Sequence, residues 1–457
     1  MSRKKKGRSL RWSKWLYPNL KVKRWFLLAS LGIIFFAAGF AVMNDGTALG
    51  YLEVKIRELM YQLTGNVPGN ALSAGLLVSG FGIVLTVVGF RRLLQSIISV
   101  LLPDEEIKLV DVMYDRQSLR RGPRIVVIGG GTGLSALLRG LKEFTSNLTA
   151  IVTVADDGGS SGMLRSEMGM IPPGDIRNCL VALADKEDIM EDLFSYRFET
   201  GTMTGHSLGN LLLAGMADAC GDFQVAVNRI SKVFALRGNV YPSTLEQVTL
   251  VADLADGKRV LGETKVRNTA GKIERVYLTP ADCRPLPEAL RALERADLIV
   301  LGPGSLYTSV LPNLLVKGLR EKIKEADAPC VYVCNIMTEP GETDDYRLLD
   351  HVRAILDHGG EGLLDAVLAN GQEIPRRLLV RYAMEGSKPV EREAAGMERL
   401  GIKYFESRLV SEGAVIRHDS RRLAKALIRI LFRLKPAGEK VDFLDTYTLS
   451  HKLRREL

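Results

Sequence analysis

Residues 124–142 read RIVVIGGGTGLSALLRGLK. A short β-branched run leads into a turn with four glycines among five residues, and a helix-like apolar segment follows. Strand, glycine turn and helix N-terminus together aim backbone N–H groups at a phosphate. The third glycine of the dinucleotide-binding fingerprint would fall at Leu134, so this turn is not that fingerprint. The stretch predicts an α/β fold with a phosphate-binding loop.

The next predicted strand, LTAIVTV at 148–154, also runs into a glycine-rich turn, ADDGGSSG at 155–162. Its adjacent acids Asp156 and Asp157 lie about 25 residues beyond the first loop, where this kind of fold places a ribose-binding carboxylate. Asx-turn and helix-capping chemistry is the alternative. We expect a ligand role for both carboxylates.

Two later loops each precede a predicted helix. In PPGDIRN at 172–178, Asp175 is the expected N-cap. Arg177 is expected to bind a phosphate or carboxylate, or else to form a helix salt bridge. In GHSLGN at 205–210, His206 is a general acid, a hydrogen-bond donor to a phosphate, or a residue packed beside the turn.

Two further apolar runs look like buried strands. DLIVL at 297–301 continues into GPGSLYTS, and CVYVCNI at 330–336 continues into MTEPGETDD. Repeated apolar strands ending in Gly, Ser, Asp and Asn predict a Rossmann-like, mostly parallel sheet with helices on both faces, whose strand ends line one cleft. Cys330 and Cys334 lie in one such run and are expected to be small buried hydrophobic residues, since no further zinc ligands have matching spacing.

The positive charge of the chain is concentrated at its beginning. Residues 1–24 contain ten Lys or Arg and no acid, whereas residues 91–457 contain 50 basic and 50 acidic residues. A neutral main body argues against a broad nucleic-acid footprint, so no nucleic-acid partner is expected.

Two uncharged apolar segments, 25–43 and 71–90, are each about long enough to cross a bilayer as a helix. Buried core helices are the alternative. The excess of Lys and Arg before the first segment predicts that the arm 1–24 and everything after residue 90 are cytoplasmic, with the loop 44–70 outside. We therefore expect a multi-pass cell-membrane protein.

The rest of the chain divides by composition. A connector is expected at 91–122, up to the Gly-Pro pair at 122–123. The nucleotide-binding domain is expected at 123–432, and a tail follows at 433–457.

Taken together, GGGTGLS, ADDGGSSG, PPGDIRN, GHSLGNLLLAGM, ADLIVLGPGSLYTSVLPNLLV and CNIMTEPGETDD closely resemble the YvcK-type gluconeogenesis factors of the CofD-like family. The resemblance covers residues 124–432. It implies a fold shared with 2-phospho-L-lactate transferases, which move a phospholactyl group from a guanosine-diphosphate donor to a deazaflavin precursor with magnesium. Typical members are expected to lack the first 121 residues.

The YvcK branch implies that the chain binds a nucleotide-sugar, such as UDP-N-acetylglucosamine, and regulates cell-wall precursor supply and cell shape during gluconeogenic growth. Expected partners are a cell-wall precursor enzyme such as glucosamine-6-phosphate synthase and a second copy of the chain. A CofD-like transferase and a structural membrane scaffold remain as alternatives.

The expected ligand-binding residues come from the loops and from two late positions that only the resemblance indicates, Tyr382 and Arg417. The loop residues are Gly129, Gly130, Gly131, Thr132, Gly133, Ser135, Asp156, Asp157, Gly158, Gly159, Ser160, Asp175, Arg177, Asn178, Asn210, Gly302, Gly304 and Ser305. Asp156 and Asp157 would also hold a magnesium ion. In a transferase, Asp157 and His206 would be catalytic.

Overall fold

The computed structural model describes residues 22–43, 71–101 and 117–435 apart from 270, 412 and 414, with a few residues between 51 and 62. The chain forms two compact units, residues 1–113 and 114–457. Most of the predicted basic arm and outside loop, residues 102–116 of the predicted connector, and the tail beyond residue 435 lie outside the described residues.

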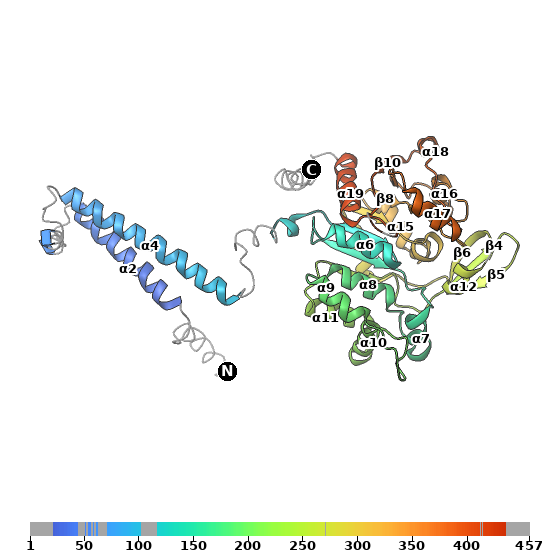
Figure 1. The fold of residues 1–457 in the computed structure, drawn as a ribbon, viewed down its shortest axis with the longest axis horizontal. Helices are drawn as coiled ribbons and strands as arrows, with labels where there is room; N and C mark the ends of the chain where they lie inside the picture. The colour runs from blue at the N-terminus through green and yellow to red at the C-terminus, as the bar shows by residue number, and fades with distance from the viewer. Residues whose placement is uncertain are drawn as a thin grey trace. The chain divides into compact units, whose positions relative to one another are not determined.

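Two long helices make up the described part of the first unit. Helix α2 (Val22–Met43) and helix α4 (Ala71–Leu101) pack side by side (Figure 1). A Cβ added to Gly82 would lie 2.4 Å from the backbone nitrogen of Phe36, so the two backbones approach as closely as glycine allows. Helix α4 continues eleven residues beyond the predicted end at residue 90, so the first part of the predicted connector is helical.

Both helices are long and apolar enough to cross a membrane. Their large side chains are mostly exposed: Leu27 on α2 is 66% exposed and Leu77 on α4 is 58% exposed. The core helix of a water-soluble domain would bury such side chains, because exposed apolar area is unfavourable in water.

The second unit is built on a seven-stranded sheet in the order β10-β9-β8-β7-β1-β2-β3, and all its strand pairs are parallel. The strands are β1 (Ile125–Gly129), β2 (Leu148–Val152), β3 (Asn239–Pro242), β7 (Leu298–Leu301), β8 (Cys330–Val333), β9 (Ala366–Asn370) and β10 (Lys403–Ser407). The predicted parallel sheet is confirmed. Strands β1, β2, β7 and β8 are buried along their whole length, as parallel strands covered on both faces must be.

The strand order reverses at the centre of this sheet. The chain builds outward from β1 to β3, then returns to place β7 on the other side of β1 and builds outward to β10. In open α/β sheets, ligands bind outside the carboxyl ends of the strands at such a switch point.

Helices form two layers around β1, which contacts both α6 and α14. Helices α6, α8 and α19 pack together in one layer (Figure 1), and α14 packs with α15 and α16 in the other. The helices are α6 (Gly131–Leu141), α7 (Gly159–Met168), α8 (Gly174–Leu183), α9 (Glu187–Ser195), α10 (Leu208–Cys220), α11 (Phe223–Val233), α12 (Glu263–Asn268), α13 (Pro287–Glu294), η3 (Leu306–Val310), α14 (Leu311–Leu314), α15 (Leu319–Glu325), α16 (Leu348–Gly359), α17 (Arg376–Met384), α18 (Ala394–Arg399) and α19 (Ser420–Leu434).

A second, antiparallel sheet was not predicted from the sequence. It has the order β5-β4-β6 and consists of β4 (Thr249–Leu254), β5 (Arg259–Leu261) and β6 (Ile273–Thr279). Helix α12 lies between β5 and β6 in the chain and packs on β4.

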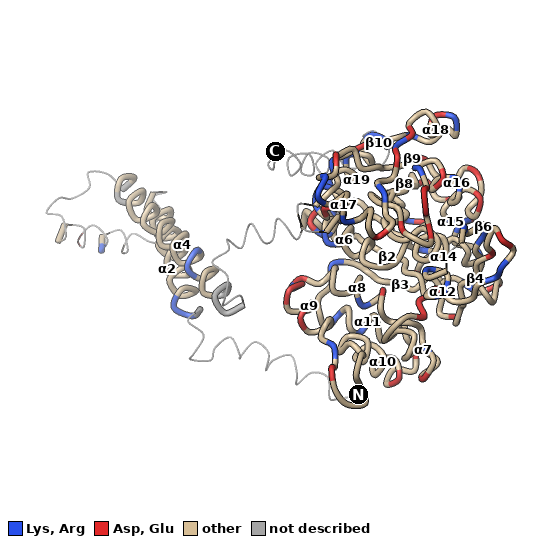
Figure 2. The backbone as a smooth tube through the Cα atoms, turned by 45° about the vertical axis from the view of Figure 1, so that its right-hand side comes forward, with Lys and Arg blue, Asp and Glu red and all other residues tan. Residues whose placement is uncertain are grey.

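The second unit has buried cysteines and a mixture of basic and acidic residues. Cys330 and Cys334 are buried free thiols, as expected of small hydrophobic residues. Burial raises the pKa of the Cys334 thiol to about 12, so it stays protonated. Both basic and acidic residues occur on many elements of this unit (Figure 2).

Candidate functional site

Two glycine loops meet at the carboxyl ends of the central strands β1 and β7. The first opens α6: Gly131 has φ +66°, and the N-cap residue Gly130 supplies no capping side chain. The N-cap residue therefore gives the first turn of α6 no side-chain acceptor, although the backbone of Gly131 bonds the carboxyl group of Asp175. An anionic ligand would take the place of a capping side chain.

The two loops touch through backbone atoms. A Cβ on Gly133 would lie 2.5 Å from the carbonyl oxygen of Pro303 in the second loop. Gly304 has φ +157°, which a residue with a side chain rarely adopts. Glycine at these positions is required by the close approach of the loops.

Side chains that follow β8 hold the second loop in place. The side-chain amide of Asn335 donates to the carbonyl oxygen of Gly304 at 3.0 Å and accepts from its N–H at 3.2 Å. It also donates to Glu339 at 3.0 Å. The buried Glu342 accepts from the Thr308 hydroxyl at 2.9 Å, and burial followed by the nearby Glu339 raises the pKa of Glu342 to about 7.

These loops line a cavity of about 270 Å³, called the cleft below. Its lining residues come from the two glycine loops, from the segment after β8, from α17 and from the segment before α19. They are Gly130, Gly131, Thr132, Gly133, Ala136, Pro303, Gly304, Ser305, Ser309, Asn335, Ile336, Met337, Thr338, Glu339, Tyr382, Ser387, Ile416, Arg417 and His418.

Tyr382 and Arg417 reach the cleft from far along the chain. The half-buried Tyr382 on α17 accepts a hydrogen bond from the backbone N–H of Ile416 at 3.0 Å, which fastens the segment that carries Arg417. Arg417 is exposed, and within the described part of the chain its guanidinium forms no ion pair. It is therefore available to an anionic ligand.

The predicted site residues separate into three groups. Eight of them line the cleft: Gly130, Gly131, Thr132, Gly133, Gly304, Ser305, Tyr382 and Arg417. Two line a neighbouring cavity together with Thr132 and Arg417: Ser135 and Asn178. The others line neither cavity: Gly129, Asp156, Asp157, Gly158, Gly159, Ser160, Asp175, Arg177, His206, Asn210 and Gly302.

Asp175 supports the first glycine loop from behind. The expectation that it caps α8 is wrong, because the chain enters α8 through Pro173 in a helical conformation, which moves Asp175 into the first turn. Its buried carboxyl group accepts a hydrogen bond from the backbone of Gly131. Burial raises the pKa of Asp175 to about 6.

Asp157 makes the contacts of a helix cap. Its carboxylate accepts hydrogen bonds from the backbone N–H of Thr264 at 2.9 Å and from the Thr264 hydroxyl at 2.6 Å, at the start of α12. Its neighbour Asp156 accepts from the N–H of Gly158 at 2.9 Å and is hydrogen-bonded to Glu263 of α12. The contacts of Asp157 are therefore those of the helix-capping alternative and not those of a ligand-binding residue.

Across the described ranges, no group of three or more His, Cys, Asp or Glu side chains is arranged to hold a metal ion. Asp156 and Glu263 nevertheless present carboxyl groups to one another. Magnesium commonly uses one or two carboxylates together with phosphate oxygens, and this pair supplies two carboxyl groups, but neither residue lines the cleft. Glu263 was not recognised in the sequence, since no local pattern connects α12 with the loop after β2.

Glu263 is expected to lower stability at alkaline pH. Burial, and then the nearby Asp156 and Asp175, raise the pKa of Glu263 to about 8. The folded state therefore keeps a proton that the unfolded state has released, and stability falls as the pH rises from about 4.5 to about 8. Glu263→Gln, which stays neutral, should stabilise the protein by on the order of 2 kcal/mol at pH 8.5 and by little at pH 4.5.

Melting curves at these two pH values test this expectation. The matched control is Glu274→Gln, which changes an exposed glutamate on β6 and should alter neither curve. An equal gain for Glu263→Gln at both pH values would show that its carboxylate is not destabilised by its surroundings.

Arg177 belongs to a polar network and does not line the cleft. Its guanidinium donates to the Ser207 hydroxyl at 2.6 Å, to the side-chain oxygen of Asn210 at 3.1 Å and to that of Asn178 at 2.9 Å. Burial and the nearby Arg197 lower the pKa of Arg177. The guanidinium is thus occupied by neutral acceptors of α8 and α10.

His206 belongs to the same network. It is buried, and its Nδ1 lies 3.1 Å from the hydroxyl of Ser160, which also accepts from the amide of Asn210 at 3.0 Å. These contacts tie the beginning of α7 to the beginning of α10. They favour the interpretation of His206 as a residue packed beside the turn over that of a general acid.

Comparisons with known proteins agree with the fold. The family model described as 2-phospho-L-lactate transferase CofD matches residues 125–410. A crystal structure of a Bacillus halodurans protein is 49% identical, with a TM-score of 0.66, and covers 67% of this chain and 99% of its own. The Bacillus subtilis "Gluconeogenesis factor" is 49% identical over 311 residues, 68% of this chain and 98% of its own.

Two relatives are similar over more of the chain. A "Putative gluconeogenesis factor" of Nostoc sp. is 46% identical over 422 residues, 92% of each chain. One of Clostridium acetobutylicum is 38% identical over 445 residues, 96% of each chain. Alignments this long extend well into the first 121 residues, so the expectation that relatives lack this region holds for some of them and not for others.

Proposed function

The chain belongs to the CofD family, among the gluconeogenesis factors, and from this premise we propose that its cleft binds a uridine-diphosphate sugar such as UDP-N-acetylglucosamine. The observation that carries the proposal is that both glycine loops, Tyr382 and Arg417 line one cavity at the switch point of the sheet.

The diphosphate would lie against the first N–H groups of α6, where the helix dipole favours negative charge. Arg417 would add charge-assisted hydrogen bonds. The apolar side chains of Ile336, Met337 and Ile416 would face the base, and the carboxylate of Glu339 would accept hydrogen bonds from hydroxyl groups.

A regulator accounts for the contacts better than a transferase does. The two candidate catalytic residues do not line the cleft, and both side chains have protein partners: Asp157 bonds Thr264, and His206 bonds Ser160.

The bound sugar nucleotide would instead report precursor level to a partner such as glucosamine-6-phosphate synthase. The amount of glucosamine-6-phosphate synthase that co-purifies with the chain should differ with and without added UDP-N-acetylglucosamine. An equal amount in both cases would show that this enzyme is not the partner to which the ligand is reported.

Mass spectrometry of small molecules released from the purified protein, with calorimetric titration by UDP-N-acetylglucosamine, tests the proposal. A released uridine nucleotide and saturable binding are expected. A guanosine-linked lactyl species would support the transferase instead. Absence of both ligands together with no measurable titration would reject nucleotide-sugar binding.

We also propose that α2 and α4 anchor this regulator in the cell membrane, with the arm 1–24 and the second unit in the cytoplasm. The exposed apolar side chains of both helices support membrane insertion, and ten basic residues in the arm 1–24 against two in the connecting loop support this orientation. In intact cells, Met60→Cys should react with an impermeant thiol reagent. Reaction only after the membrane is opened would reverse the orientation.

A further inference from the structure

The cleft is small for the ligand proposed above. Its volume of about 270 Å³ falls below the roughly 300–1,000 Å³ typical of small-molecule sites. A second cavity of about 540 Å³ lies beside it. Thr132, Ala136, Arg417 and His418 line both cavities, so the two lie side by side and share these residues.

The two cavities differ in the side chains they present. The cleft has a group of large apolar and aromatic side chains, which includes Ile336, Tyr382 and Ile416 and suits a flat base. The second cavity has no aromatic lining residue other than the shared His418, and only Ala136 and Val181 among its lining residues lack a polar side-chain group. Closely spaced hydrogen-bonding side chains suit a ligand with many hydroxyl groups.

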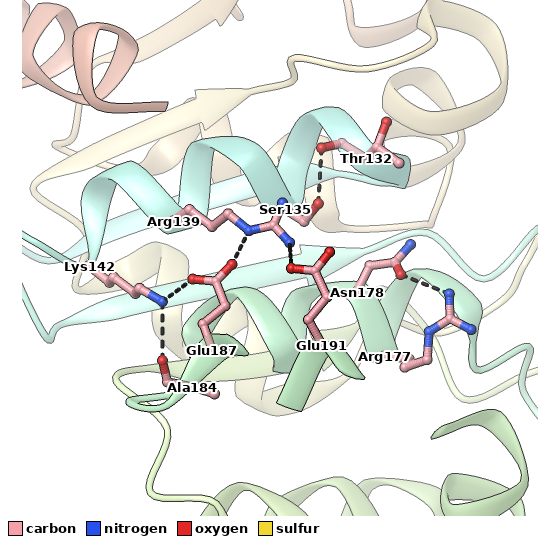
Figure 3. Close-up of polar contacts among 9 residues, drawn as sticks. All are labelled: Thr132, Ser135, Arg139, Lys142, Arg177, Asn178, Ala184, Glu187 and Glu191. Atoms are coloured by element: carbon pink, nitrogen blue, oxygen red, sulfur yellow. Dashed lines mark hydrogen bonds and ion pairs between the residues drawn. The ribbon is translucent and has the colours of Figure 1, made fainter. Parts of the chain in front are cut away.

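The second cavity is also poorly suited to a further anion. Figure 3 shows Arg139 on α6 in ion pairs with Glu187 and Glu191 of α9, so its charge is already matched. Its lining residue Arg421 is paired with Glu143. The guanidinium that both cavities share, that of Arg417, has no such partner among the described residues.

Asn178 illustrates the hydrogen-bonding capacity of the second cavity. Its side-chain oxygen accepts from Arg177 at 2.9 Å, which fixes the orientation of the amide (Figure 3). Its NH₂ group donates to no other described side chain or backbone group. A fixed donor of this kind recognises a hydroxyl or acetamido oxygen by direction.

We propose that the second cavity holds the sugar of the nucleotide-sugar, with the nucleoside in the cleft and the diphosphate between them, at Arg417 and the N-terminus of α6. This assignment rests on the proposed function. It makes Asn178, Glu191 and Ser195 determinants of sugar specificity.

Ser195→Trp tests the assignment, because Ser195 is exposed at the end of α9 and lines only the second cavity. The indole should fill this cavity and weaken binding of UDP-N-acetylglucosamine at least tenfold, while the dissociation constant for UDP changes less than twofold. Calorimetric titration of both ligands against the full chain measures this. Leu193→Trp, which places the same indole at an exposed position of α9 outside both cavities, is the matched control and should leave both constants unchanged.

A second variant, Asn178→Ala, adds no bulk. Like Ser195→Trp, it should weaken binding of UDP-N-acetylglucosamine more than binding of UDP. Melting curves identify a variant that fails to fold. If Ser195→Trp and Asn178→Ala weaken UDP and UDP-N-acetylglucosamine equally, or affect neither, the sugar does not lie in the second cavity. If the unaltered protein binds neither ligand, the proposed function fails and this assignment falls with it.

Discussion

Replacing Arg417 with alanine is expected to weaken binding of UDP-N-acetylglucosamine by about 10- to 150-fold. A hydrogen bond to a charged group contributes about 1.5–3 kcal/mol, and this guanidinium lies where the cleft and the second cavity meet. Thermal stability should be unchanged, because Arg417 is exposed and pairs with no acidic group in the described part of the chain.

Titration calorimetry and a melting curve measure the two quantities separately. Arg417→Lys keeps the charge but loses the planar fork of donors, so its affinity should be intermediate. Arg408→Ala is the matched control, since Arg408 is an exposed arginine of the same region that lines neither cavity. Normal affinity in Arg417→Ala would show that the diphosphate lies elsewhere.

Gly133→Ala is expected to reduce affinity further, by at least about 100-fold, because it displaces the loops that form the cleft. The new Cβ would lie 2.5 Å from the carbonyl oxygen of Pro303, a backbone atom that cannot move aside without its loop. Overpacking of this kind costs about 1–3 kcal/mol of stability. Both the affinity and the melting temperature should therefore fall.

The control separates this clash from the general effect of alanine in a helix. Gly215 lies within α10, and a Cβ there would meet no atom within 4 Å. Gly215→Ala should stabilise the protein by up to about 1 kcal/mol through helix propensity, with unchanged binding. If Gly133→Ala bound the nucleotide-sugar as tightly as the unaltered protein, the contact between the two glycine loops would have no role in forming the site.

Some features of the site could be predicted because they are local in the chain. A β-branched run, a glycine turn and an apolar helix follow one another within 124–142, and the same pattern recurs at the other strands. Parallel strands of this kind place their carboxyl ends at one edge, so the meeting of the loops at 129–133 and 302–305 follows from the strand pattern. The two long helices could likewise be predicted from unbroken apolar sequence.

Other features depend on contacts between distant residues. Asp157 and Thr264 are 107 positions apart, and nothing near either indicates that one caps the helix of the other. The antiparallel sheet that carries α12 brings Glu263 to Asp156, and neither residue has a local signal for that contact.

By itself, the sequence of this protein determined the class of the fold, the position of its glycine loops and the presence of two helices apolar enough for a membrane, because each depends on residues adjacent in the chain. Only the tertiary structure decided which polar residues share a cavity. It put Tyr382 and Arg417 beside the loops through the hydrogen bond to Ile416, and it left Arg177 and His206 in a network behind them. The physical reason is that a side chain's role depends on burial and on partners supplied by other elements, which local spacing does not encode.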